Sequence, residues 1–524
     1  MINNTKYRTI YILPLFCILI FFILKSVYRP ADDYAGYYFG SKFFLQKLFD
    51  APTIYETYAF NQKIYAEGYA NILACYTPFP PITSLFFLPF TFFDLCTSKL
   101  IFNSLSALLF LFSLVRLIKF LTLPNWIYLL IPLVFFIPIR NTVFFGQAYL
   151  ILFALIAEGF IFYKKEKHLY ASLLWGLAIV FKIFPLICLL FLLFKKEWKQ
   201  IKYLTIVVVL LLSISFFFNG LEVWKTYLTE IFPRVSNGEL NSPFAAEYQS
   251  MFMLLKKAFV YDSLQNPFPL FDSPQFFLFN FLFKVIVLSF CAFVSLNKKT
   301  EDIKSLGIWV LGSILISPNG STYSLVLLLI PFLSIIQMEY NNLFKGILIL
   351  ILLLINNLPV HLFFSLPVLL QFPRLYLMIS VFIFLIYRYT TTINYSVLLV
   401  FFVLFAIVSI PAVYAKNNDD STYLFSKNKY AITYDYLIKD NKLIVYYYSD
   451  FKGAESDTID FKQSVNPSAD VYLKNNQIYL ENKKLTNTND RKMKPVLLYS
   501  GLLLYLSDKN RGVGFYTLRV KKVI

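Results

Sequence analysis

The sequence predicts an all-α polytopic membrane protein with a small β-rich domain at its C-terminal end. The 524 residues are 58% hydrophobic and only 15% charged, a composition too apolar for one water-soluble core. Apolar runs recur from residue 11 to residue 415, and several approach the roughly 17 to 25 residues that a helix needs to cross the hydrocarbon layer. Charged residues, asparagines and alternating aromatic or β-branched residues follow. We therefore assign residues 1–415 to a transmembrane domain and residues 416–524 to an extracytoplasmic β-rich domain.

The net charge of +18 could suggest a nucleic-acid partner, but we predict none. Basic residues stand in short clusters between the apolar runs or are spread through the C-terminal region, a distribution typical of cytoplasmic anchoring. The five cysteines form no C-x-x-C pair, which argues against a disulfide framework and a zinc site. They are Cys17, Cys75, Cys96, Cys188 and Cys291. We predict no metal ligand and no certain cofactor, and a divalent metal ion is left open.

The first apolar run, residues 11–27, is expected to be an uncleaved membrane anchor. Lys6 and Arg8 precede it and no small-x-small cleavage site follows it, so we place the amino end in the cytoplasm. An outer loop at residues 28–80 then emerges on the other side of the membrane. We expect short amphipathic helices at the interface within this loop, at residues 41–49 and 54–69.

Two basic clusters, at residues 164–167 and 195–199, orient the central helices. Both should be cytoplasmic because basic residues concentrate on that side. The apolar segment between them must then go out and return, with its turn near residues 181–185, which brings Lys182 to the outer face. The alternative is one long helix with Lys182 near its middle, a costly position unless the charge is paired or reaches water.

The remaining apolar runs alternate between the two sides, with an outer loop at residues 219–274 and prolines that interrupt the early runs. We expect about 13 crossings if the run at residues 82–95 does not cross. The runs besides the first and the central segment are 82–95, 100–115, 126–139, 142–163, 203–218, 275–296, 306–316, 325–336, 346–358, 375–387 and 397–413.

Four segments of the C-terminal domain are rich in alternating aromatic or β-branched residues, a pattern that predicts strands. Lys474-Asn475-Asn476 separates the last two and is expected to form a hairpin turn. The predicted strands are 430–437, 442–448, 470–473 and 477–480.

Several polar residues fall on the predicted outer surface. Two adjacent carboxylates, Asp32 and Asp33, stand where the chain leaves the bilayer, just before aromatic residues. The other polar residues on this side are Gln147, Lys182, Gln249 with its neighbours Tyr248 and Ser250, and residues 317–323, Tyr323 included. Their agreement on one side indicates a functional site, because the sides were assigned mainly from the basic clusters.

An enzyme on the outer face has no ready supply of nucleotide sugars or ATP, so it would draw on an activated group carried by a membrane lipid. A carboxylate can take the proton from an acceptor hydroxyl that attacks the anomeric carbon of a sugar. The leaving lipid phosphate is already anionic and needs cations or amide donors. Asp33 suits the first role, and Lys182 with Gln147 or Gln249 suits the second. Direct displacement would invert the anomeric configuration.

Each of these residues also has a purely structural interpretation. Acidic residues at a helix exit are commonly just solvated. Lys182 is alternatively an interfacial lysine that reaches water, and Gln147 a polar bridge between helices. Gln249 and Ser250 alternatively cap a helix that begins near Met251.

Short motifs occur in a fixed order along roughly residues 11–331. They are Asp33-Tyr34…Tyr37-Tyr38, Tyr76-Thr77-Pro78-Phe79-Pro80-Pro81, Gly146-Gln147, Gly176-Leu177-Ala178…Lys182…Pro185, Tyr248-Gln249-Ser250 and Ser317-Pro318. This order resembles glycosyltransferase family 87. The resemblance implies the GT-C fold and a polyprenyl-phosphate sugar, typically mannose, as the donor.

The resemblance also implies a catalytic aspartate in the first outer loop. The family's Asp-aromatic-x-x-Tyr pattern falls on Asp33 and Tyr37, and a shift by one residue to Asp32 is left open. The chain departs from the pattern after Ser317-Pro318, because residues 319–323 stand where many relatives place a tryptophan and a histidine. The sugar and the acceptor therefore stay undetermined, and the family gives no account of the β-rich domain.

Our leading hypothesis is an inverting glycosyltransferase at the outer face of a bacterial inner (plasma) membrane. It would move mannose, or another hexose or a pentose, from a polyprenyl-phosphate donor to a glycan or lipid acceptor. The substrate-binding residues would be Lys182, Gln147, Gln249, Tyr37 and Tyr323. One alternative is a transporter or flippase of lipid-linked glycans, which would favour an internal repeat and ionisable groups near the midplane. Another is a non-catalytic scaffold that displays the β-rich domain.

Overall fold

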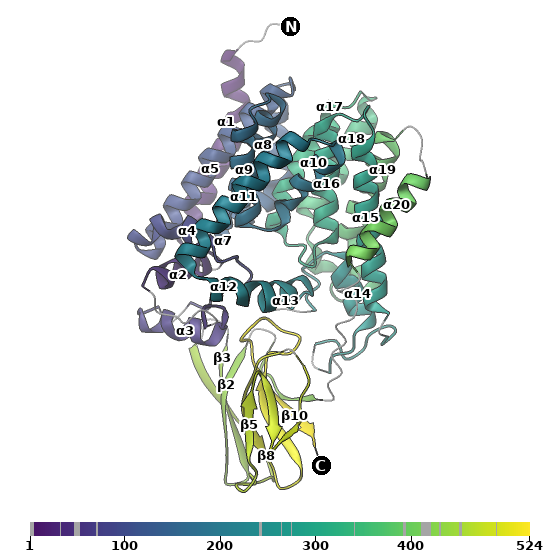
Figure 1. Ribbon diagram of the computed structural model, residues 1–524. Helices are drawn as coiled ribbons and strands as arrows, with labels where there is room; N and C mark the ends of the chain where they lie inside the picture. Colours follow the sequence, from purple (N-terminus) through teal and green to yellow (C-terminus); the bar gives the residue numbers. More distant parts are fainter. Residues whose placement is uncertain are drawn as a thin grey trace.

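Helices form the body of the molecule, and β strands form a region at one end of it (Figure 1). The first helix begins at the opposite end of the body. The predicted β-rich C-terminal region is therefore present. The computed structural model describes residues 5–31, 33–46, 53–69, 72–239, 244–263, 265–273, 275–339, 341–390, 395–409, 421–428, 431–449, 453–488 and 490–523.

The helices of the body follow the predicted apolar runs, and short 3₁₀ segments stand between or before several of them. The α-helices are α1 (Thr5–Val27), α5 (Leu95–Phe120), α6 (Ile127–Val134), α7 (Phe136–Phe145), α8 (Tyr149–Lys164), α9 (His168–Phe181), α10 (Ile187–Lys195), α11 (Trp198–Asn219), α15 (Phe276–Leu296), α16 (Asp302–Ile316), α17 (Leu329–Gln337), α18 (Asn342–Asn357), α19 (Pro373–Tyr389) and α20 (Tyr395–Ser409). The 3₁₀ segments are η3 (Phe184–Leu186), η5 (Thr322–Leu328), η6 (Val360–Phe363) and η7 (Val368–Gln371).

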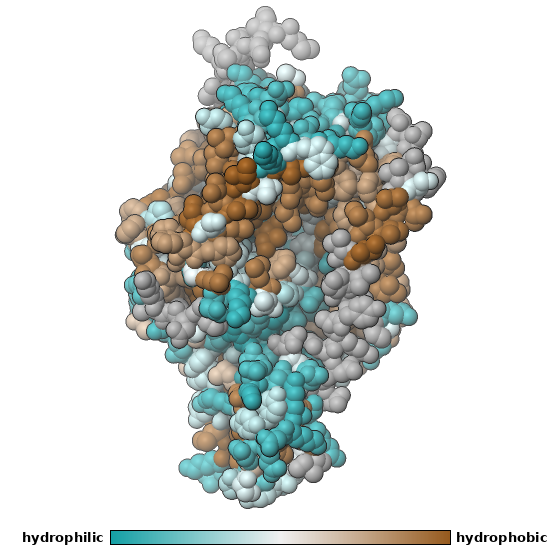
Figure 2. All heavy atoms as spheres, viewed as in Figure 1, coloured by the Kyte–Doolittle hydropathy of each residue, from teal (hydrophilic) through white to brown (hydrophobic). Residues whose placement is uncertain are grey.

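The surface of the body is that of a membrane protein. Among the described residues, four helices, α1, α5, α11 and α15, are long and apolar enough to cross a membrane. The pair α6 and α7, bent by 63°, adds a fifth if it forms one span. Figure 2 shows hydrophobic residues in a broad band over the body, between hydrophilic ends. The other apolar helices are shorter, so the number of about 13 crossings stays a prediction.

The two basic clusters of the central segment lie at the same end of the body. Lys164, at the end of α8, and Lys195, at the end of α10, both pair with Asp302, at N–O distances of 2.6 and 3.3 Å. Between them α9 ends at Phe181, and Lys182 leaves the helix with extended backbone angles. The predicted reversal near Lys182 is confirmed, and one continuous helix through this segment is excluded.

Short helices cover the end of the body that faces the β region (Figure 1). The predicted helix at 41–49 is wrong in its bounds, because the helix begins at Asp33, whose negative charge favours a helix start. The predicted helix at 54–69 is shorter, and the expected outer loop at 219–274 contains helices. The bounds are α2 (Asp33–Leu45), η1 (Thr53–Tyr55), α3 (Thr57–Ala66), α4 (Thr83–Phe87), η2 (Leu88–Phe92), α12 (Leu221–Thr226), the π-helical η4 (Tyr227–Ile231), α13 (Phe232–Ser236) and α14 (Met251–Phe259).

Over its described residues, the β region consists of three antiparallel sheets, with strand orders β1-β10-β9-β8, β2-β3-β4 and β5-β6-β7. The predicted hairpin between β5 and β6 is confirmed, since Asn475 and Asn476 have φ angles of 51° and 59°, as a two-residue type I′ turn requires. The bounds are β1 (Thr422–Phe425), β2 (Ile432–Lys439), β3 (Lys442–Ser449), β4 (Gly453–Asp460), β5 (Val471–Lys474), β6 (Gln477–Leu480), β7 (Lys483–Lys484), β8 (Lys492–Leu497), β9 (Leu502–Ser507) and β10 (Thr517–Lys522).

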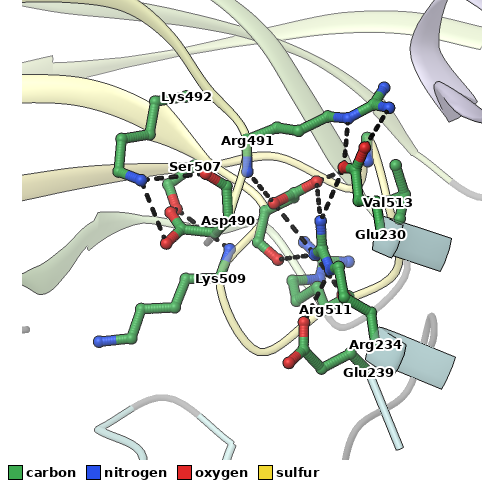
Figure 3. Close-up of polar contacts among 12 residues, drawn as sticks. Glu230, Arg234, Glu239, Asp490, Arg491, Lys492, Ser507, Lys509, Arg511 and Val513 are labelled. Atoms are coloured by element: carbon green, nitrogen blue, oxygen red, sulfur yellow. Dashed lines mark hydrogen bonds and ion pairs between the residues drawn. The ribbon is translucent and has the colours of Figure 1, made fainter. Parts of the chain in front are cut away.

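Ion pairs join the β region to the covering helices (Figure 3). The guanidinium of Arg234 on α13 donates to Asp508 Oδ2 at 3.1 Å and to Glu239 Oε2 at 2.8 Å. Arg491 donates to both carboxylate oxygens of Glu230, at 2.7 and 3.0 Å. Burial alone would lower the pKa of Arg234, but the carboxylates, Asp508 first, outweigh it and raise that pKa. Arg234 is therefore a permanent cation inside this contact.

Helix α3 makes a second contact with the β region. The rings of Tyr58 and Tyr434 stack with centroids 5.2 Å apart, and Thr57 donates its hydroxyl proton to the carbonyl of Val513 at 2.6 Å. Glu56, which caps α3 by accepting from the Ala59 amide, lies beneath the loop at Gly514. The β region is thus packed directly on the segments that precede and follow the central helices.

Replacing Glu56 with glutamine should remove part of the pH dependence of stability. Burial raises the pKa of this carboxyl from 4.5 to about 7, despite the Ala59 hydrogen bond. The folded chain therefore binds more protons than the unfolded chain, so this stabilisation is present below pH 4.5 and lost as the pH rises to about 7. Between pH 4.5 and about 7, we expect the free energy of unfolding of the wild type to fall by roughly 2–4 kcal/mol more than that of the variant. Denaturant unfolding of both proteins at several pH values checks it, and identical slopes would contradict it.

Candidate active site

Asp33 is the first residue of α2, and its carboxylate is held by a residue more than a hundred positions away. The side-chain amide of Gln147 donates to Asp33 Oδ2 at 2.7 Å. Gln147 follows α7, which ends at Gly146 with a positive φ of 64°. A Cβ atom at Gly146 would lie 2.6 Å from Cβ of Tyr34, so glycine allows this turn to approach α2. The Gly146-Gln147 motif therefore serves the carboxylate directly.

Two donors fix the orientation of the Gln147 amide. Its Oε1 atom accepts from the Tyr37 hydroxyl at 3.0 Å and from Lys182 Nζ at 3.2 Å. The NH₂ group must then face Asp33, because both neighbours on the other side donate. Tyr37 is itself clamped between aromatic rings, with centroid distances of 4.0 Å to Phe79 and 4.3 Å to Phe87. Gln147 is 4% exposed, so the amide is buried and its orientation is set by these contacts.

Lys182 reaches the cluster from the break between α9 and η3. Its Nζ atom lies 4.0 Å from the centre of the Tyr149 ring, a cation–π distance. The Tyr149 ring is 5.3 Å from the ring of Tyr323, which stands on η5. Asp33, Gln147, Tyr37, Lys182 and, through Tyr149, Tyr323 thus form one continuous group.

The charge balance favours a basic carboxylate at Asp33. Burial raises the pKa of Asp33, while the Gln147 hydrogen bond and then the charges of Lys182 and Lys99 lower it, and the net direction is upward. A carboxylate with a raised pKa holds a proton more tightly and is a better general base. The nearby lysines limit that increase, so the group can still lose its proton.

Gln249 does not join this group through any of its side-chain hydrogen bonds. Its amide donates to the carbonyls of Ala246 and Gln371, at 2.7 and 2.8 Å, and its Oε1 atom accepts from the Arg374 amide at 3.2 Å. These partners are all backbone atoms, so the Gln249 side chain links its own loop to the segment at residues 371–374. Ser250 caps α14 by accepting from the Met253 amide. Asp32 lies outside the described residues.

Sequence reasoning missed two arginines close to this site. The guanidinium carbons of Arg29 and Arg140 lie 5.2 and 6.0 Å from the centre of the Phe144 ring, just before the Gly146-Gln147 turn. Lys99, which is 4% exposed, donates to the carbonyl of Pro30 at 2.7 Å. The sequence did contain a signal for these residues, because basic residues on the predicted outer side are not explained by cytoplasmic anchoring. In the part of the chain that the structure describes, no group of three or more His, Cys, Asp or Glu side chains could hold a metal ion.

The arrangement combines a solvent-accessible carboxylate, a buried amide that orients it and nearby cations at one end of a helical membrane body. Comparison with curated proteins found no match, and comparison with solved structures found none either. A family model does match the chain, over the segment that contributes Phe79, Gln147, Tyr149 and Lys182 to the site. Residues 76–318 match the model of glycosyltransferase family 87, the family that the order of the sequence motifs indicates, and this match supports glycosyltransferase activity.

Proposed function

We propose that the protein is an inverting glycosyltransferase that uses a polyprenyl-phosphate sugar, with Asp33 as the general base. The sugar would be mannose, or another hexose or a pentose, and the acceptor a glycan or a lipid. The observation that supports this best is the Asp33 carboxylate, which stays open to solvent while the buried Gln147 amide donates to it at 2.7 Å. A carboxylate that only needed solvation at a helix exit would not require a buried amide partner.

The transfer would proceed in one displacement. The oxygen of the acceptor hydroxyl forms a bond to the anomeric carbon as the bond from that carbon to the phosphate oxygen breaks. Asp33 takes the hydroxyl proton, and the lipid phosphate leaves with the electron pair of the broken bond. Attack from the face opposite the phosphate inverts the anomeric configuration.

The leaving phosphate needs cations that are already in position. Lys182 donates to Gln147, and its charge lowers the pKa of Asp33 more than that of Lys99 does. Arg29 and Arg140, which flank Phe144, offer guanidinium groups suited to phosphate oxygens. Tyr149 and Tyr323 provide aromatic surface beside these cations.

We also propose that the site faces the extracytoplasmic side of a bacterial inner (plasma) membrane and that the chain crosses it about 13 times. The Lys164 and Lys195 end of the body is the cytoplasmic one under the positive-inside rule. Helix α2, which begins at Asp33, and the β region lie away from that end (Figure 1), and Lys182 contacts Gln147, the partner of Asp33. Lipid-linked donors are available on the outer side, where nucleotide sugars are not.

Purified protein incubated with a panel of polyprenyl-phosphate sugars and a membrane glycolipid extract tests this proposal. The readout is release of the lipid phosphate together with the anomeric configuration of the product. At least one donor should turn over with inversion. Retention of configuration, or no release from any sugar in the panel, would overturn the proposal.

Lys182→Met should lower kcat/KM by roughly 10- to 100-fold and move the acidic limb of the pH profile upward by about 1 pH unit. The base must be deprotonated, so activity falls as the pH drops through the pKa of Asp33. Lys182 holds that pKa down against burial, and its removal lets the pKa rise. Lys42→Met is the matched control, because Lys42 lies on the same helix as Asp33 but pairs with Glu67. An unshifted limb would show that Lys182 does not act on the base.

A further inference from the structure

A cavity of about 400 Å³ lies between the segment at residues 244–265 and the β region. No residue of the Asp33 group lines it. One wall is built by Phe244, Glu247, Lys257 and Gln265 from the segment that matches the family. The other wall includes Ser426, in the turn after β1, which lies outside that match. The volume falls in the range of about 300–1,000 Å³ typical of ligand sites. We call this cavity the interdomain cleft.

The two walls are held together by a direct contact. The hydroxyl of Tyr423 on β1 donates to Asp262 Oδ2 at 2.9 Å. Asp262 in turn forms a bridge with Asn266, which frames the turn that carries Gln265. The cleft is therefore a feature of the assembled molecule, and the β region is required to complete it.

The lining of the interdomain cleft suits a carbohydrate. Phe244 and Phe364 offer aromatic surface for the apolar faces of sugar rings, while Glu247 and Lys257 offer an acceptor and a donor for hydroxyl groups. Nε2 of Gln265 is a buried donor that has no hydrogen-bond partner among the described residues. Such an orphaned group is rare and costly unless a ligand or water satisfies it, and a rotation of the Gln265 side chain, which lines the cleft, would present it to a sugar hydroxyl.

A short stretch of chain links the cleft to the Asp33 group. The segment 244–247 that lines the cleft continues into Gln249, whose backbone lies 3.0 Å from where a Cβ atom on Gly320 would stand. Ser250 donates its hydroxyl proton to the carbonyl of Pro318 at 2.9 Å. The loop at 317–321 then leads directly into η5, which presents Tyr323 to Tyr149 beside Lys182. The wall of the interdomain cleft is thus connected to the Asp33 group by packed segments of the chain.

We propose that the interdomain cleft binds the oligosaccharide part of the acceptor, and that the β region selects the acceptor by closing the cleft. This inference rests on the proposed function and deepens it. It gives the β region, which lies outside the family match, a role in substrate choice. The acceptor would be a polar oligosaccharide, either free or attached to a lipid.

Binding of defined linear trisaccharides to the full-length protein tests the inference. The panel contains trisaccharides of mannose, glucose and N-acetylglucosamine, each as the free sugar and as the octyl glycoside, with affinities measured by calorimetry. At least one should bind the wild type. Ser426→Trp, which fills the cleft, should weaken that binding at least 10-fold, and Gln265→Leu, which removes the orphaned donor, should weaken it roughly 3- to 10-fold.

Ser464→Trp is the matched control, because it places the same large side chain on an exposed serine of the β region outside the cleft. It should leave binding unchanged. The melting temperatures of all variants are compared, and Gln265→Leu carries the test if Ser426→Trp does not fold. Equal affinity for the free sugar and its octyl glycoside identifies a free glycan acceptor, and tighter binding of the glycoside a glycolipid; either result supports the cleft.

Slow release of lipid phosphate in the absence of acceptor separates this inference from the proposed function. The cleft variants should keep that release, because Asp33 and its partners are untouched. Weakened binding in a protein that never releases lipid phosphate would support the cleft and reject the glycosyltransferase mechanism. Unchanged affinity in both Ser426→Trp and Gln265→Leu, or no binding of any trisaccharide in the panel, would overturn the inference.

Discussion

Asp33→Asn should lower the rate of sugar transfer by roughly 10²- to 10⁴-fold while the protein still folds. Asparagine keeps the shape of the side chain and an oxygen that can accept from the Gln147 amide, so packing changes little. It cannot take the proton from the attacking hydroxyl. The rate of lipid-phosphate release with acceptor present and the melting temperature, measured on the same preparation, separate the two effects.

Asp32→Asn is the matched control for this substitution. The two carboxylates are adjacent, and the resemblance to the family leaves a shift of one residue open. Because Asp33 is the residue held by Gln147, we expect Asp32→Asn to retain most of the activity. Full activity in Asp33→Asn would reject Asp33 as the base, and loss of activity in Asp32→Asn alone would move the base to Asp32.

Arg234→Ala should cost about 3–5 kcal/mol of the free energy that keeps the β region docked. The Arg234 side chain is 6% exposed and contacts Asp508, which is fully buried, and Glu239. Removing the guanidinium leaves these carboxylates without their shared cation in a place that water reaches poorly. Native-state proteolysis of the β region, which reports the population of the opened form, measures the loss.

Lys427→Ala provides the comparison for Arg234→Ala. Lys427 pairs with Asp457 at 2.9 Å within the β region, but both side chains are more than a third exposed, at 44% and 34%. Surface pairs of this kind contribute about 1 kcal/mol or less. Similar protease sensitivity in the two variants would mean that the buried ion pairs of Figure 3 do not hold the β region in place.

Features decided by neighbours in the sequence could be predicted well. The turn at Asn475 and Asn476 follows from the ability of asparagine to adopt a positive φ. The reversal at Lys182 follows from two basic clusters that cannot lie on opposite sides of a membrane. The start of α2 at Asp33 was missed, because its apolar residues pack against the Tyr76 to Phe87 segment and show little periodicity by themselves.

The difference between Gln147 and Gln249 could not be predicted. Both are glutamines beside Gly or Ser in a motif on the predicted outer side, and the sequence offers a functional and a structural interpretation for each. Gln147 contacts Asp33 from 114 positions away, whereas the Gln249 amide is satisfied by backbone atoms. Which amide meets the carboxylate depends on how α7 and α2 pack, and neighbouring residues carry no information about that.

The sequence by itself determined the membrane character, the order of the helices, the β-rich C-terminal region and the resemblance to glycosyltransferase family 87. These follow from hydrophobicity, charge bias and turn chemistry, which act over a few residues. Only the tertiary structure decided that Asp33, Gln147 and Lys182 meet, that Arg234 fastens the β region to the covering helices, and that a cleft opens between them. Most of these contacts join residues more than a hundred positions apart, and their free energy depends on burial and geometry that only the folded chain creates.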